Sequence, residues 1–331
     1  MTAARFDVIG IGNAIVDIIG RCDEAYLAKI DAAKGSMRLV GADDVKKIYT
    51  TMGPAMEISG GSAANTIAGV ASFGGKAAFI GTVADDEFGK IFTHDIHSIG
   101  VTFDTQPIAN GAPTSRSLIL VTPDGERTMN TFLGISTSLN ETQLNHQLIE
   151  ESEILYLEGY LFDEPQAKQA FRSALKTAKK ANRKVALTLS DGFCVDRHRD
   201  EFIELIHAGI DILFANESEI KSLYQTESFD LAAKTVSNDV RLAALTRSEK
   251  GSVIFADGKS IEIASEKIPA VVDTTGAGDL YAAGFLFGYS KGFELPVCGQ
   301  LASLAAAEII GHIGARPEVS LAELAHQRHI V

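Results

Sequence analysis

The sequence predicts an α/β fold: a mostly parallel sheet with helices on both faces, and a small second β-sheet beside it. Two patterns support this prediction. From residue 153 onward, short apolar runs alternate with amphipathic helical segments, as in a parallel sheet with helical crossovers. Residues 100–133 instead contain short β-like runs and show no helical period. The 331 residues are ample for such a core, so we expect residues 1–331 to form one domain.

The composition argues against several classes of partner. The chain has 30 basic and 43 acidic residues, a net charge of −13. Such a surface repels nucleic acid and anionic membranes, and we expect neither as a partner. The three cysteines lie far apart and form no CxxC pair, which favours a reducing, cytoplasmic location. We expect no secretory leader and no membrane span. The apolar run Leu301–Ala315 carries Glu308 and His312, and it predicts a core helix.

The first apolar run, Phe6–Gly20, begins like a buried central strand and is predicted to continue as strand. Its glycines partly match a dinucleotide-binding fingerprint. An NAD-linked dehydrogenase would need a helix directly after Gly12, and none is predicted. Asn13 and Asp17 are four residues apart and would share one face of an extended strand. They either complete a turn near the strand end or bind the hydroxyl groups of a ligand.

The segment Glu57–Asn65 combines a strand-like piece, a Gly60-Gly61 turn and the start of a helix that runs to about Phe73. In a plain turn, Ser62 would be the N-cap of that helix. Before it, residues 25–51 hold two helical pieces around a candidate lid strand, Lys34–Val40, whose Met37 either packs or contacts a ligand.

A β-hairpin is predicted next. Ser117–Thr122 and Arg127–Phe132 are joined by Thr-Pro-Asp-Gly-Glu, a strong hairpin signal. These runs form the small sheet outside the main α/β body. Arg127 in this flap either makes a surface ion pair or closes over a bound substrate.

The regular half of the chain predicts the strands of the main sheet. Strands are expected at Ile154–Glu158, Lys184–Leu189, Ile210–Ala215 and Leu242–Thr246, helices at Pro165–Ala181 and Arg199–His207, and a hairpin at Val253–Ile263. Ligands bind at the carboxyl ends of parallel strands. Tyr160 follows one such end and either stacks on a base or packs in the core. Asn216 and Glu219 follow another, where they also suit a helix cap and first turn.

A glycine-rich turn near residue 276 is the strongest local signal. A β-type segment, Ile268–Val272, is followed by the turn Asp273–Gly278 and an apolar, alanine-rich helix. Free amides and the positive end of the dipole meet at a helix N-terminus, which makes an anion site. Asp279 lies in the first helical turn. It either stabilises the dipole or takes a proton from a hydroxyl that attacks a phosphoryl group.

Two of these segments carry a family resemblance. Asp273–Phe285 resembles the C-terminal signature of the PfkB (ribokinase-like) family of carbohydrate and nucleoside kinases, and Glu57–Asn65 resembles its N-terminal signature. The resemblance covers about residues 6–317. The opening Gly-Ile-Gly-Asn-Ala-Ile-Val-Asp-Ile, residues 10–18, is closer to the adenosine kinase branch.

The resemblance implies a ribokinase-like fold and phosphoryl transfer from ATP, with Mg²⁺, to a hydroxyl group. The expected acceptor is the 5′-hydroxyl of adenosine, and the alternative is a sugar such as ribose or fructose. A catalytically idle binding protein of the same fold is a further alternative, but it would not need Asp279. The small sheet would be a lid over the acceptor, formed by about residues 14–40 and 100–133. The protein would be a monomer or homodimer.

The resemblance also implies roles for single residues. Asp279 would be the catalytic base, and Gly276, Ala277 and Gly278 would form the anion hole. The acceptor would contact Asn13, Asp17, Met37, Gly60, Gly61, Asn65, Arg127 and Tyr160. ATP would contact Asn216, Thr246, Gly251, Thr275, Gly278 and His312. Glu219 would position Mg²⁺ through water, and K⁺ could bind near Asp273. The family often has glycine where this chain has Ser248.

Overall fold

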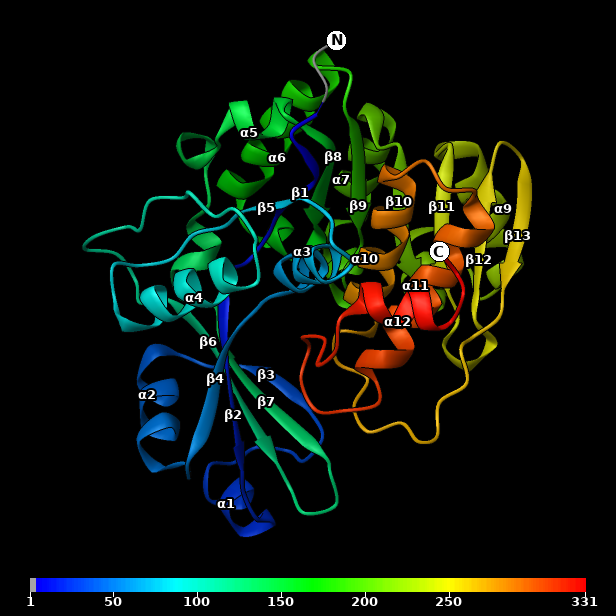
Figure 1. The fold of residues 1–331 in the computed structure, drawn as a ribbon. Helices are drawn as coiled ribbons and strands as arrows, with labels where there is room; N and C mark the ends of the chain where they lie inside the picture. Colours follow the sequence, from blue (N-terminus) through cyan, green and yellow to red (C-terminus); the bar gives the residue numbers. More distant parts are fainter. Residues whose placement is uncertain (1–3) are drawn as a thin grey trace.

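The computed structural model describes residues 4–331, so the first three residues of the predicted domain lie outside it. An eight-stranded sheet forms its centre (Figure 1). In spatial order, its strands are β13 (Lys259–Ile263), β12 (Ser252–Ala256), β11 (Leu242–Thr246), β10 (Ile212–Asn216), β9 (Lys184–Thr188), β8 (Ser152–Glu158), β1 (Phe6–Ile11) and β5 (Ala77–Ile80). The pairs from β11 to β5 are parallel, and β12 and β13 add an antiparallel edge. The predicted mostly parallel sheet is confirmed.

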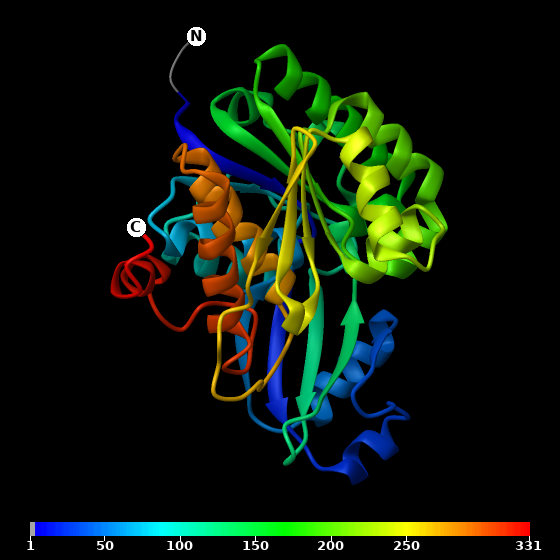
Figure 2. The same cartoon turned by 90° about the vertical axis from the view of Figure 1, so that its right-hand side faces the viewer.

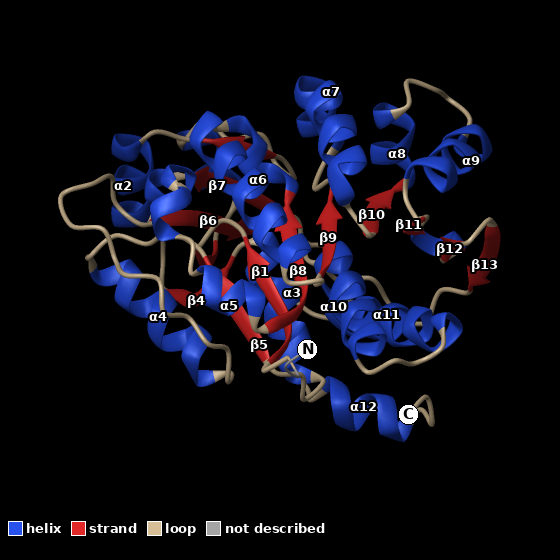
Figure 3. Ribbon diagram, turned by 90° about the horizontal axis from the view of Figure 1, so that it is seen from above, coloured by secondary structure: helices blue, strands red, loops and turns tan. Residues whose placement is uncertain are grey.

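Helices cover both faces of this sheet because alternate strand residues are apolar on both sides. In β8, Ile154 and Tyr156 join one buried cluster, and Leu155 and Leu157 join the other. One face carries α3 (Ser62–Ser72), α4 (Glu87–Ser98), α10 (Ala277–Ser290), α11 (Leu295–Ile309) and α12 (Leu321–Gln327). The other carries α5 (His146–Glu150), α6 (Pro165–Lys180), α7 (Gly192–Gly209), α8 (Glu217–Leu223) and α9 (Phe229–Asp239). Figure 3 shows α7–α9 and α10–α11 on opposite sides.

A second sheet extends from the first (Figure 2). Its order is β3 (Met37–Leu39), β7 (Arg127–Phe132), β6 (Ser115–Val121), β2 (Ile15–Arg21) and β4 (Ala55–Gly60). One face is covered by α1 (Glu24–Lys29) and α2 (Ala42–Thr51), whose buried residues meet Val16, Ile18, Leu118 and Leu120. The predicted small sheet and its hairpin are confirmed. The sheet also includes β4, which the predicted lid segments left out.

The structure corrects the prediction of one continuous strand over Phe6–Gly20. The chain leaves the main sheet after Ile11 and enters the second sheet at Ile15. β1 pairs with β5 and β8, whereas β2 pairs with β4 and β6. Asn13 therefore lies in the link between the two sheets and does not share a strand with Asp17. An apolar run cannot reveal this change because both halves are buried strands.

Other predicted boundaries also change. Ile268–Val272 is not a strand: the sheet ends at β13, and the Val272 amide donates to the carbonyl of Ile310 instead (2.8 Å). The core helix predicted to reach Ala315 ends at Ile309, before a glycine-containing loop. Helix α7 begins at Gly192, ahead of the predicted Arg199, and continues past a non-helical residue, His198. Short 3₁₀ helices are Gly134–Ser138, Glu141–Gln143, Gly159–Asp163 and Ser248–Lys250.

No helix within residues 4–331 is long and apolar enough to cross a membrane. Cys22, Cys194 and Cys298 are all free thiols.

Candidate active site

Helix α10 begins directly after a tight glycine turn. Its N-cap residue, Gly276, has a left-handed backbone (φ 79°), and a Cβ there would lie 2.9 Å from the Cβ of Ala315. Glycine adopts this conformation at little cost, and other residues do not. The Ala277 amide donates to the Thr274 carbonyl (3.2 Å). The first amides of a helix have no intrahelical acceptor and carry the positive end of its dipole, so this turn suits an anion.

The Asp279 carboxylate is held by residues of α3, the helix that follows the other glycine motif. Ser62 Oγ donates to Oδ1 (2.6 Å), and Asn65 Nδ2 donates to Oδ2 (2.9 Å). Thr66 Oγ1 donates to the Asp279 carbonyl (3.1 Å). Burial raises the pKa of Asp279, and the two side-chain hydrogen bonds oppose that rise. The fold thus joins the two predicted motifs into one site.

The Gly60-Gly61 turn passes close to two other predicted residues. A Cβ at Gly60 would collide with the carboxylate of Asp17, and a Cβ at Gly61 would collide with the Asn13 carbonyl. Gly61 also has a positive φ (101°) and is itself the N-cap of α3. The alternative in which Ser62 caps the helix is therefore wrong. Burial raises the pKa of Asp17 to about 6, although Arg316 and Arg127 lower it.

Glu158 is a site residue that the sequence analysis missed. It ends β8 and is 1% exposed. Its Oε1 accepts from the Asn13 side chain (2.6 Å) and amide (3.3 Å), and its Oε2 accepts from the Ala63 amide (2.8 Å). Burial raises its pKa to about 7. Its position at the carboxyl end of a predicted strand could have identified it as a site residue, because the same argument makes Tyr160 a candidate.

Asn13 is consequently engaged inside the protein. Its side-chain nitrogen donates to Glu158, and its side-chain oxygen accepts from Ser136 Oγ (2.8 Å). Asn13 is 3% exposed. Its polar groups join β1, β8 and the segment after β7, where the two sheets meet.

Arg127 of β7 forms a buried ion pair with Asp273, the first residue of the glycine turn. The two side chains are 7% and 4% exposed. The alternative of a surface ion pair for Arg127 is therefore wrong. Asp273 also accepts from the amides of Thr275 (3.0 Å) and Gly314 (3.2 Å). The pair links the second sheet to the turn before α10.

Met37 and Tyr160 lie on different elements of the fold. Met37 is 54% exposed on β3. Tyr160 follows β8, and its hydroxyl donates to the Ser190 carbonyl (3.3 Å), next to the start of α7. Neither side chain is a buried core residue.

Asn216 and Glu219 form a capping box at the start of α8. Asn216 Oδ1 accepts from the Glu219 amide (2.8 Å), and the Glu219 carboxylate accepts from the amide (2.9 Å) and side chain (2.5 Å) of Asn216. Burial raises the pKa of Glu219 to about 7, and the charges of Asp191 and Asp279 contribute to this rise. The helix cap that the sequence allowed is therefore formed. Glu219 is also one of three acidic residues, with Asp191 and Asp279, whose charges interact.

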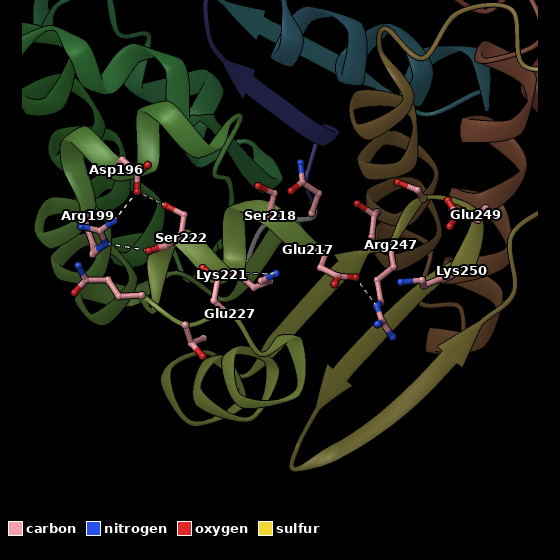
Figure 4. Close-up of a pocket in the computed structure, with 15 residues that line it drawn as sticks. Asp196, Arg199, Glu217, Ser218, Lys221, Ser222, Glu227, Arg247, Glu249 and Lys250 are labelled. Carbon is pink, nitrogen blue, oxygen red and sulfur yellow. Dashed lines mark hydrogen bonds and ion pairs between the residues drawn. The ribbon is translucent and has the colours of Figure 1, made fainter.

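Asn216 and Thr246 line an open cavity of about 890 Å³ at the carboxyl ends of β10 and β11 (Figure 4). Its lining includes Arg247, whose guanidinium bonds to Glu217 (3.0 Å) and stacks over the ring of Phe229. This is the strand end at which ligands of parallel sheets bind.

Three other predicted nucleotide contacts are not among the residues that line this cavity. Gly251 has φ 82°, and a Cβ there would collide with the Ile263 carbonyl. Thr275 belongs to the turn before α10. His312 follows α11, where its Nε2 lies 3.1 Å from Glu308 Oε1. His312 is not among the residues that line the cavity in Figure 4.

Within residues 4–331, no three His, Cys, Asp or Glu side chains are grouped closely enough to form a protein cage for a metal. Glu219 nevertheless lies in an acidic region that it shares with Asp191 and Asp279. Magnesium keeps several waters and needs few protein carboxylates. A hydrated divalent cation beside Glu219 fits this donor set.

Comparison with known proteins adds a family match. The model of the pfkB family of carbohydrate kinases matches residues 26–321. The structure is similar to an adenosine kinase from Sinorhizobium meliloti (52% identity, TM-score 0.91, covering 98% of this chain and 100% of that one). It is also similar to a probable sugar kinase from Rhizobium etli (47% identity, TM-score 0.92, covering 99% of this chain and 100% of that one).

A curated relative, the probable chloroplastic fructokinase-6 of Arabidopsis thaliana, is 31% identical over 239 residues. The match covers 69% of this chain and 61% of that protein.

Proposed function

Because this chain belongs to the pfkB family of carbohydrate kinases, we propose that it transfers the γ-phosphoryl group of ATP to the 5′-hydroxyl of a nucleoside, most simply adenosine. Asp279 is the proposed base. Its carboxylate already accepts from Ser62 and Asn65, and a carboxylate has room for a further donor such as an acceptor hydroxyl. Transfer of that proton to Asp279 would make the hydroxyl oxygen a better nucleophile.

The remaining chemistry is positioning and charge stabilisation. The start of α10 at Gly276–Gly278, with its free amides and the positive end of the helix dipole, is proposed to stabilise the charge that the phosphoryl oxygens gain. ATP is proposed to reach this turn from the strand ends that carry Asn216 and Thr246. Mg²⁺ would neutralise phosphate charge beside Glu219. A monovalent cation near Asp273 remains a prediction.

An apolar row on the second sheet is the observation that favours a nucleoside. The register aligns one residue of each strand across the sheet: Met37, Met129, Ile119, Ile19 and Met56. We call this set the apolar row. It lies on the face away from α1 and α2, because Val16 and Ile18 of β2 point to those helices while Asp17 and Ile19 alternate with them. Arg127, on the same face, reaches Asp273 of the α10 turn.

On β2, the apolar row is represented by Ile19, which lies two residues after Asp17 on the same face of the sheet. Two residues of a strand span about 7 Å, a separation that suits a sugar and its attached base. Met37 and Met56 are 54% and 57% exposed, which leaves apolar surface for a ligand to cover. A free sugar would bury hydroxyl groups at Asp17 but would not need this row. Asn13, Gly60, Gly61, Asn65 and Tyr160 complete the proposed acceptor contacts.

A sugar kinase is the second candidate. The similarity to the Rhizobium etli protein and to the plant fructokinase favours it. In either case, we propose that residues 1–331 act as one kinase domain whose second sheet closes over the acceptor and excludes water.

The test is ATP consumption with Mg²⁺ across adenosine, inosine, guanosine, ribose and fructose. We expect saturation by adenosine at low concentration and little turnover with free sugars. Turnover with ribose or fructose alone would replace the nucleoside proposal with the sugar kinase. Asp279→Asn protein serves as the control for contaminating ATPase activity.

A further inference from the structure

Arg316 lies in the loop between α11 and α12 and binds both ends of the Gly60-Gly61 turn. Its Nε donates to the carbonyl of Ser59 (2.8 Å), and its Nη2 donates to the Ser59 hydroxyl (2.9 Å). Its Nη1 donates to the carbonyl of Ala64 (2.5 Å). Ser59 is in β4 and Ala64 is in the first turns of α3, so one side chain connects the second sheet to a helix of the main body.

The turn needs such support because its two glycines have no side chains that could hold it in place. Glycine gains conformational freedom from its missing side chain, and two in succession form a flexible joint. From the other side, Asp95 of α4 accepts from the amide (2.8 Å) and hydroxyl (2.5 Å) of Ser59. Arg316 and Asp95 together hold Ser59, but only Arg316 also reaches α3. That helix carries Ser62 and Asn65, the two donors to Asp279.

The charge of Arg316 also acts on the acidic centre. The charged groups near it are Asp17 of β2, Asp95 of α4 and Asp279 of α10. The positive charge of Arg127 in β7 lowers the pKa of Asp17. The negative charge of Asp279 raises the pKa of Asp17 and that of Glu158 in β8. Burial raises the pKa of Asp17 and of Asp279, and Arg316 lowers both. Burial in turn lowers the pKa of Arg316 to about 10, so it remains charged at neutral pH.

We propose that Arg316 is a positioning residue for phosphoryl transfer. It fixes the Gly60-Gly61 turn against α3, so that Ser62 and Asn65 hold the Asp279 carboxylate, and it keeps a positive charge beside the carboxylates around that turn. This inference rests on the proposed kinase function for its catalytic half. Its structural half, the clamp on the turn, does not depend on turnover.

The test compares Arg316→Met and Arg316→Lys with a matched control, Arg328→Met. Arg328 lies just after α12, where it is 55% exposed and pairs with Glu266 (3.2 Å). Methionine removes both charge and hydrogen bonds. Lysine keeps the charge but offers a single nitrogen, which cannot reproduce the three separate contacts of a planar guanidinium.

In R316M, we expect the acid limb of kcat/KM to move to higher pH by about one unit, because a carboxylate that loses a nearby cation binds its proton more tightly. R316K should keep the wild-type limb and raise KM for the acceptor about tenfold, since the loosened turn no longer presents the site. R328M should match the wild type in both measurements. Equal pH limbs in R316M and the wild type would overturn the electrostatic role. If R316M does not fold, R316K decides the positioning role, and an unchanged KM refutes it.

Hydrogen exchange separates this inference from the proposed function. In ligand-free protein, the amides of residues 57–67 should exchange at least about tenfold faster in R316M or R316K than in R328M, because the turn opens more often. Unchanged protection would overturn the clamp even if the wild type is an active kinase. If the wild type phosphorylates no acceptor but protection falls as expected, the proposed function fails and the clamp stands.

Discussion

Asn65 Nδ2 lies 2.9 Å from Asp279 Oδ2, although the two residues are 214 positions apart in the chain. Each belongs to one of the two glycine motifs. Because α3 and α10 pack with Gly69 against Ala283, their first turns meet. The catalytic carboxylate proposed for the second motif is therefore held by an amide of the first.

Replacing Asp279 by asparagine should abolish most turnover. The amide cannot take a proton, and we expect kcat to fall by about 10³-fold while the Kd for ATP stays within a few fold. Steady-state kinetics and nucleotide titration measure the two quantities. Asp257→Asn, on the exposed turn of the β12–β13 hairpin, is the control. A kcat for D279N within tenfold of wild type would remove Asp279 from the mechanism.

Met129→Ala should distinguish a nucleoside acceptor from a sugar. Met129 sits in the apolar row between Met37 and Ile119. Losing its contact with a base should cost about 1–2 kcal/mol, or roughly tenfold in kcat/KM for adenosine. The control is Ile99→Ala, at the C-terminal end of α4, which should leave kcat/KM unchanged for adenosine and for a sugar. If M129A leaves adenosine kinetics unchanged, the base does not bind at the apolar row.

Glu158 should make the folded state less stable as the pH rises. Its pKa is raised to about 7 in the folded protein, so between about pH 4.5 and 7 the folded chain binds more protons than the unfolded chain. The free energy of unfolding therefore falls through this window, by at most about 1.4 kcal/mol per pH unit for one such group. Urea unfolding from pH 5 to 8 measures the slope.

Glu158→Gln should flatten that slope, because glutamine does not titrate. The exposed Glu262→Gln of β13 should leave it as in the wild type. The same slope in E158Q and the wild type would assign the pH dependence to other carboxyl groups, such as Asp17 and Glu219, whose pKa values are also raised.

Ser248→Gly should stabilise the fold. Ser248 has φ 51°, the left-handed conformation that favours glycine and costs other residues about 1 kcal/mol. Part of that gain is lost to the greater entropy of glycine in the unfolded chain, so we expect a net gain of a few tenths of a kcal/mol. Ser248→Val, with a β-branched side chain, should destabilise by more than this. Chemical denaturation of both variants checks the order, and a less stable S248G would contradict it.

Much of the fold was predictable from the sequence because its signals are local. Alternating apolar runs and helices specify a parallel sheet, and the hairpin signal before Arg127 specifies part of the second sheet. The turn at Gly276 and the cap at Asn216 follow from local backbone chemistry. The family and both glycine motifs were visible for the same reason.

The tertiary structure decided what depends on distant partners. Phe6–Gly20 is one apolar run, and only pairing with other strands divides it between two sheets at Asn13. The sequence left open whether Arg127 makes a surface ion pair or closes over a substrate, and only folding brought Asp273, far along the chain, against it. Glu158 and Arg316 carry no local motif; their roles come from Asn13, Ser59 and Ala64, which lie up to 257 positions away. Local propensity encodes elements, whereas a charge becomes part of a site only when folding removes it from water and supplies its partners.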